Sequence, residues 1–85
     1  MYLIGDIGNT ETKILILNDK FKTKVKYTFK TKLISKKYIE TKFLFLKKKN
    51  RINRALFCSV VPKAFNIFKK FIFEHSSIRC MELKN

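Results

Sequence analysis

Glycine, proline and tryptophan are scarce or missing in this sequence of 85 residues, which has two Gly, one Pro and no Trp. With so few chain-bending residues, each Gly and the single Pro mark a specific turn or boundary. The two Cys, Cys58 and Cys80, are too far apart for a Cys-x-x-Cys pair, and one His cannot complete a metal cluster. Because both Cys lie in apolar runs, we expect reduced, buried thiols.

Long apolar segments are also absent. The chain opens with Met1 to Ile4 and reaches Asp6 at once, without the basic segment and apolar core of a signal peptide. No apolar run approaches the ~18 residues that a membrane-spanning helix needs. We therefore expect a cytoplasmic protein with no membrane partner.

Acidic residues are few: 6 Asp+Glu stand against 20 Lys+Arg, a formal net charge of +14. Such an excess is an electrostatic signal for nucleic acid, so a small basic nucleic-acid-binding module is one hypothesis. Lys supplies 17 of the 20 cations, and the lysines are scattered rather than gathered on one periodic face. A base composition that favours Lys, Ile, Phe and Asn explains this pattern better, and nucleic acid is not the partner we expect.

Hydrophobic residues make up 46% of the chain and include nine Phe, too many for a disordered chain. The first third predicts three strands. Residues 2–5 and 13–17 are apolar and are joined by a turn at 6–10, whose Gly, Asn and Asp tolerate tight bends and positive φ. Residues 21–31 alternate, with one side of the strand apolar: Val25, Tyr27 and Phe29.

The remaining residues predict two helices and two strands. Ser35 is a typical N-cap for a helix to about Lys49, with Ile39, Phe43 and Leu46 on one face, although residues 42–46 also fit a strand. Residues 55–61 form a continuous apolar run, typical of a strand buried on both faces. Pro62 begins a second helix that ends near His75 and packs its Phe side chains in the core, and residues 78–83 form a last strand.

The predicted order is βββαβαβ in a single α/β domain spanning residues 1–85. A meander followed by α/β crossovers makes a mixed five-stranded sheet with helices packed on it. This topology is typical of the ribonuclease-H-like half domain of actin-like ATPases and sugar kinases, although fold alone does not assign function.

The stretch from Gly5 to Lys13 carries the chemistry. At the end of a strand, the carboxylate of Asp6 can hold Mg²⁺ through the waters of the metal. The amides of Gly8, Asn9 and Thr10 can form an anion-binding concavity, the hydroxyls of Thr10 and Thr12 add donors, and Lys13 adds a positive charge. A metal, amides and a cation are what a polyphosphate needs. The alternative is an ordinary hairpin turn with a surface Asp.

Asp6-Ile-Gly-Asn-Thr10 with Lys13 resembles the first phosphate-binding motif of type III pantothenate kinases, and Ser59-Val-Val-Pro62 resembles the Ser-Val-Val-Pro segment of that family. The resemblance implies transfer of the γ-phosphoryl group of ATP to pantothenate in coenzyme A synthesis, with Mg²⁺ and K⁺ or NH₄⁺, by a homodimer. It implies Asp6 as the metal-binding residue. The cofactor-binding residues implied are Asp6, Ile7, Gly8, Asn9, Thr10, Glu11, Thr12 and Lys13.

Two departures from the family pattern matter. Glu11 stands where relatives often carry a neutral residue, and a carboxylate beside phosphates would repel them. No Gly-x-Asp-Arg segment, to which the resemblance attributes the catalytic Asp and a pantothenate-binding Arg, occurs in the sequence. We therefore expect an N-terminal half domain that lacks the C-terminal half and is inactive alone. A non-catalytic remnant with an exposed Phe-rich surface is the other alternative. Ser59 is expected to be structural rather than nucleophilic, and His75 to be a surface partner of a helix dipole.

Overall fold

The computed structural model describes residues 1–44 and 52–83. It confirms the predicted βββαβαβ order and adds one short 3₁₀ helix after the third strand. In chain order, the elements are β1 (Tyr2–Ile7), β2 (Glu11–Leu17), β3 (Thr23–Lys30), η1 (Thr31–Leu33), α1 (Lys36–Lys42), β4 (Arg54–Ser59), α2 (Pro62–Ser76) and β5 (Met81–Glu82).

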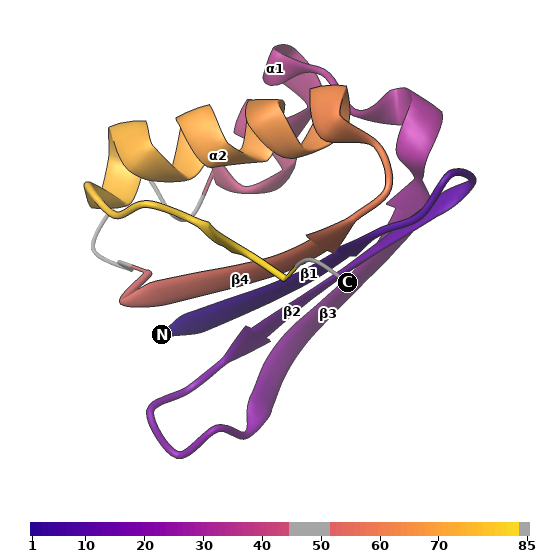
Figure 1. Ribbon diagram of the computed structural model, residues 1–85. Helices are drawn as coiled ribbons and strands as arrows, with labels where there is room; N and C mark the ends of the chain where they lie inside the picture. The colour runs from indigo at the N-terminus through magenta and orange to yellow at the C-terminus, as the bar shows by residue number, and fades with distance from the viewer. Residues whose placement is uncertain (45–51, 84–85) are drawn as a thin grey trace.

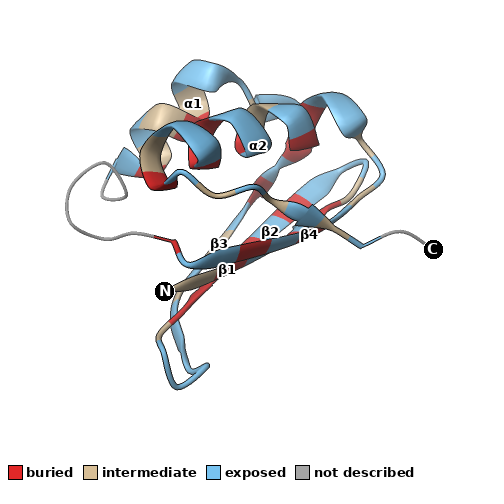
Figure 2. Cartoon of the chain, turned by 60° about the vertical axis from the view of Figure 1, so that its left-hand side comes forward, coloured by how far each residue is buried: buried red, intermediate tan, exposed pale blue. Residues whose placement is uncertain are grey.

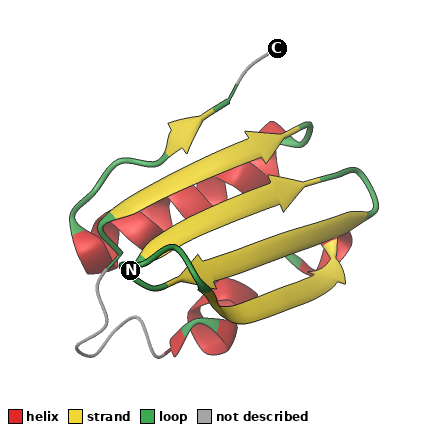
Figure 3. Cartoon of the chain, turned by 90° about the horizontal axis from the view of Figure 1, so that it is seen from below, coloured by secondary structure: helices red, strands yellow, loops and turns green. Residues whose placement is uncertain are grey.

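The sheet is mixed, as predicted, with strand order β3-β2-β1-β4-β5. β1 pairs antiparallel with β2 and parallel with β4, β2 pairs antiparallel with β3, and β4 pairs parallel with β5. Both helices lie on one face of this sheet (Figure 1). The arrangement leaves the other face free of helices among the described residues, as the view from below shows (Figure 3).

The core fills the space between the sheet and the two helices, where the buried residues gather (Figure 2). Alternate side chains along each strand point toward the helices, and these side chains form one side of the core. Aromatic rings supply much of the rest: Phe68 on α2 lies with its ring centroid 5.2 Å from that of Phe57 on β4 and 5.9 Å from that of Phe43 after α1. The buried hydrophobic residues are Leu3, Ile7, Ile14, Ile16, Leu17, Phe29, Ile39, Phe43, Ile52, Ala55, Phe57, Ala64, Phe65, Phe68, Phe71 and Ile72.

α1 begins where the sequence predicts, because the Ser35 hydroxyl accepts a hydrogen bond from the Tyr38 amide at 3.1 Å. It ends at Lys42, earlier than the predicted Lys49, while Leu46 and the lysines of residues 47–49 lie outside the described residues. The Lys42 ammonium lies 5.4 to 5.5 Å from the centroids of three rings, on Tyr27, Phe29 and Tyr38. This cation–π contact ties the end of α1 to β3.

β4 differs from its prediction. The sequence predicts a strand buried on both faces, but burial alternates, with Ala55 and Phe57 buried and Leu56 and Cys58 exposed. The reason is that no described element covers the face of the sheet opposite the helices. The prediction that both thiols are buried is therefore wrong for Cys58. Cys80 is partly buried, and this burial raises the pKa of its thiol to about 11, with nearby Lys69 acting in the opposite direction.

α2 starts at Pro62, as predicted, and ends one residue past His75. Ser77 then adopts the left-handed conformation with φ of 57°, a frequent way for a helix to end. His75 is not the surface residue that was expected: its ring packs against Phe71 with centroids 4.6 Å apart, and its Nε2 is buried with no hydrogen-bond partner among the described residues. Neither helix in the described ranges has the length and apolar character to cross a membrane.

Candidate phosphate-binding site

The β1–β2 hairpin is tighter than the sequence predicts. β1 continues through Asp6 to Ile7, so the connection is only Gly8, Asn9 and Thr10 rather than residues 6–10. The Gly8 amide donates to the Glu11 carbonyl at 3.0 Å and closes the turn, so it is not free to bind an anion. No residue of this turn has a positive φ, since the described residues adopt positive φ only at Phe21 and Ser77. Asn9 and Thr10 are exposed at the tip, and among the described residues no backbone hydrogen bond engages their amides.

Asp6 and Lys13 face each other across the hairpin. They are register partners in the antiparallel β1–β2 pair, so their side chains leave the sheet on the same face. That face is the one without helices, and both residues are exposed there. They line a hollow of about 230 Å³ with Ile4, Leu15 and Lys26. Neither side chain makes an ion pair or hydrogen bond within the described residues, so a carboxylate and an ammonium group are both available to a ligand.

Two of the predicted site residues point the other way. Ile7 is 1% exposed and Thr12 is 0% exposed, both inside the core. The Thr12 and Thr31 hydroxyl oxygens are 2.8 Å apart, and the Thr31 hydroxyl donates to the Gly8 carbonyl at 2.7 Å. Since each hydroxyl has one proton and Thr31 has given its own to Gly8, Thr12 must donate to Thr31. Thr12 therefore has no proton left for a phosphate, and it supports the hairpin from inside.

Thr31 also supports this hairpin, although it lies outside the two sequence motifs. Its amide also donates to the Thr10 carbonyl at 2.9 Å, so Thr31 contacts both ends of the turn. A signal for it existed in the sequence. Val25, Tyr27, Phe29 and residue 31 fall on the same side of the alternating strand, and a Thr at an inward position predicts a buried hydroxyl that needs a partner.

The two sequence motifs meet in space. Ile7, the last residue of β1, is the register partner of Ser59, the last residue of β4, and the Val60 amide donates to the Ile7 carbonyl at 3.0 Å. The β4–α2 connection and the hairpin tip therefore lie at the same end of the sheet (Figure 1). Ser59 is structural, as expected, because its hydroxyl accepts from the Val61 amide at 3.0 Å.

Glu11 lies on the open face of the hairpin, two residues before Lys13. Its partner in the β2–β3 register is Lys30, a cation of opposite sign on the neighbouring strand. Opposite charges at directly opposed positions attract, so Lys30 offsets part of the repulsion that Glu11 would exert on a phosphate.

The residues at the tip fit a magnesium ion that is held mainly by its own waters and by phosphate oxygens. Mg²⁺ in nucleotide sites commonly takes only one or two protein carboxylates. Asp6 supplies one exposed carboxylate, and no group of three or more His, Cys, Asp or Glu suited to a metal occurs in the part of the chain that the structure describes.

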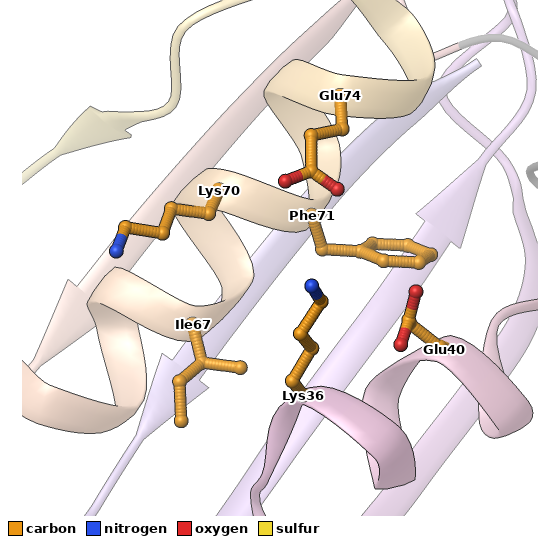
Figure 4. A pocket seen from close by; sticks show the side chains of 6 residues that line it. All are labelled: Lys36, Glu40, Ile67, Lys70, Phe71 and Glu74. Atoms are coloured by element: carbon orange, nitrogen blue, oxygen red, sulfur yellow. The ribbon is translucent and has the colours of Figure 1, made fainter.

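A larger hollow of about 320 Å³ lies between α1 and α2 (Figure 4). Its charged residues are two Lys–Glu pairs at i, i+4 spacing, Lys36 with Glu40 and Lys70 with Glu74. This spacing is typical of solvated helix surfaces. Because the helices cover the face opposite Asp6, this hollow is separate from the hairpin site.

Comparison with known proteins identifies the family of this chain. A sequence model of the family described as type III pantothenate kinase matches residues 2–85. The type III pantothenate kinase of Pelagibacter ubique (strain HTCC1062) is 46% identical over 85 residues, which is 99% of this chain and 34% of that relative. The chain thus spans about a third of the length of this curated relative. The mixed five-stranded sheet with its two helices agrees with an actin-like ATPase half domain, and the chain belongs to the type III pantothenate kinase family.

Proposed function

We propose that this chain is the nucleotide-phosphate-binding half of a type III pantothenate kinase, which phosphorylates pantothenate with ATP. The observation that carries the proposal is the pairing of Asp6 with Lys13 beside an exposed three-residue turn, in a chain of this family. Asp6 would hold Mg²⁺ through its waters, Lys13 would contact phosphate oxygens, and the amides of Asn9 and Thr10 would donate to them.

Phosphoryl transfer depends mostly on positioning and on stabilising charge, so a rigid hairpin with these groups is a suitable half of such a site. When bound, Mg²⁺ neutralises charge on the β- and γ-phosphates. The side chain of Ile7 takes no part, because it lies in the core. We propose, on the family resemblance, that the complete enzyme also uses K⁺ or NH₄⁺ and acts as a homodimer.

The substitution Asp6→Asn is expected to weaken Mg²⁺-dependent ADP binding on the order of tenfold to hundredfold, the usual effect of removing a partner of the metal's waters. Binding should be measured by calorimetry with and without Mg²⁺, at about 0.15 M salt, where the Debye length is roughly 8 Å and diffuse attraction to a basic chain is screened.

Asp19→Asn is the matched control. It removes the same charge from an exposed Asp, whose side chain is 85% exposed, in the turn at the opposite end of β2. Both substitutions raise the net charge by one, so unspecific attraction of ADP would strengthen equally in both variants. Equal ADP binding by the Asp6 and Asp19 variants would refute the role of Asp6.

Pantothenate phosphorylation by the purified 85-residue chain is expected to be undetectable. The sequence contains no Gly-x-Asp-Arg segment, which the family resemblance identifies as the source of the catalytic Asp and of an Arg that binds pantothenate. Product should be sought with radiolabelled ATP, Mg²⁺ and K⁺. Turnover above a blank without pantothenate would show that this chain contains a catalytic group elsewhere.

A further inference from the structure

Thr31 makes three hydrogen bonds to the hairpin that carries Asp6 and Lys13. Its amide donates to the Thr10 carbonyl at 2.9 Å, its hydroxyl donates to the Gly8 carbonyl at 2.7 Å, and its hydroxyl oxygen accepts from Thr12 at 2.8 Å. The side-chain distances are typical of good O–H···O bonds. Through these bonds one residue outside the hairpin contacts the first and last residues of its turn.

The contact is buried. Thr31 is 6% exposed and Thr12 is 0% exposed. A buried hydroxyl that loses its partner remains desolvated and unpaired, which makes alternative positions of the turn unfavourable. The hydroxyl chain from Thr12 through Thr31 to Gly8 also has a fixed direction, and in such a chain each bond polarises and strengthens the next.

We propose that Thr31 is a positioning residue, which fixes the turn Gly8 to Thr10 so that the amides of Asn9 and Thr10 and the neighbouring Asp6 meet a nucleotide phosphate in one geometry. The proposal rests on the proposed function of the hairpin. Thr31 does not contact the ligand: it lies on the core side of the sheet, and it acts through the carbonyl groups of the turn.

The test compares Thr31→Val with Thr31→Ser in the 85-residue chain. Val keeps the shape and loses both hydroxyl bonds, whereas Ser keeps the hydroxyl. Thr31→Val is expected to weaken Mg·ADP binding about tenfold, the fold-change equivalent to roughly 1.4 kcal/mol. It should also speed hydrogen exchange at the Gly8 amide by a similar factor. Thr31→Ser should restore both quantities to within about twofold of the parent.

Ser76→Ala separates positioning from simple loss of stability. The Ser76 hydroxyl accepts from the Ile52 amide at 3.2 Å in a buried contact at the end of α2. Ser76→Ala should lower the free energy of unfolding about as much as Thr31→Val does. It should leave both Mg·ADP binding and hydrogen exchange at the Gly8 amide unchanged. Should Thr31→Val fail to fold, Thr12→Val removes one bond only, leaves the Thr31–Gly8 bond in place, and should give a smaller change in the same direction.

The two readouts distinguish this inference from the proposed function. If the unsubstituted chain did not bind Mg·ADP at all, the proposed function would be overturned. Hydrogen exchange at the Gly8 amide would still test the role of Thr31. Unchanged Gly8 exchange in Thr31→Val, or equal weakening of Mg·ADP binding by Thr31→Val and Ser76→Ala, would overturn the role of Thr31.

Discussion

Replacing Phe68 with Ala is expected to lower the free energy of unfolding by about 3–5 kcal/mol, the usual range for removing a buried Phe. Phe68 is 1% exposed, and its ring joins those of Phe43 and Phe57, so it connects α2 to α1 and to β4 at once. A domain of this size has a total stability of roughly 5–15 kcal/mol. The variant should therefore unfold at a much lower urea concentration than the parent, as followed by circular dichroism.

Phe73→Ala is the matched control on the same helix. Phe73 is 50% exposed and lies on the outer side of α2. Its removal should change stability by no more than about 0.5 kcal/mol, as for most surface substitutions. If both variants lost the same stability, the packing of α2 on the sheet would have to differ from the one described.

The burial of the Phe side chains also contradicts the alternative of an exposed Phe-rich surface. Of the Phe residues that the structure describes, six are buried, and only Phe21 and Phe73 are among the exposed hydrophobic residues. Among the described strand residues, the large exposed hydrophobic ones are instead Ile4, Leu56 and Met81, none of which is aromatic. The prediction that the Phe side chains of this helix lie in the core is confirmed for Phe65, Phe68 and Phe71, and it is wrong for Phe73.

Strand alternation also predicted correctly which side of β3 is apolar and inward: Val25, Tyr27 and Phe29 turn toward the core, where the Phe29 ring packs against Tyr38 of α1. The apolar sequence of β4 was a poorer guide. It does not show that one face of this strand is left uncovered by any described element. A run of apolar residues shows that both faces of a strand can be buried. Whether both faces are buried depends on which other elements cover them.

Both site motifs, Asp6–Thr10 with Lys13 and Ser59–Pro62, could be recognised in the sequence, but their arrangement in space could not. Lys13 was predicted on the second strand, but Asp6 was predicted in the turn, whereas it lies inside β1 and pairs with Lys13 across the hairpin. The meeting of the hairpin with the Ser59–Pro62 segment depends on the parallel pairing of β1 with β4, which no local pattern specifies. The support by Thr31 likewise depends on the β2–β3 register, which a shift of one residue would reverse.

Gly5→Ala is the second substitution with a large expected effect, and it concerns the strand that carries Asp6. The sequence placed Gly5 at the end of a strand, but it lies inside β1 on the core side, directly beside Phe57 of β4. A Cβ on Gly5 would lie 2.3 Å from the Phe57 Cε2 atom and 2.4 Å from Cδ2, far inside van der Waals contact. Glycine is needed here for space and not for backbone freedom, since its φ is not positive.

The Phe57 ring cannot easily move away from an added methyl group. It is 0% exposed, and its centroid lies 5.4 Å from that of Phe65 and 5.2 Å from that of Phe68. Overpacking a closed core typically costs about 1–3 kcal/mol and sometimes more. We expect Gly5→Ala to reach or exceed the upper end of this range in urea unfolding.

A double-mutant cycle identifies the cause. Phe57→Leu alone should destabilise the chain, because it removes ring contacts with α2, but it opens space beside Gly5. In the Gly5→Ala/Phe57→Leu variant the two losses should therefore sum to more than the observed loss, with a coupling energy of about 1 kcal/mol or more. Additive losses would mean that the added methyl group clashes elsewhere. Partial recovery would show that the close approach of β1 to β4, which brings Asp6 beside the end of β4, requires a residue without a side chain at position 5.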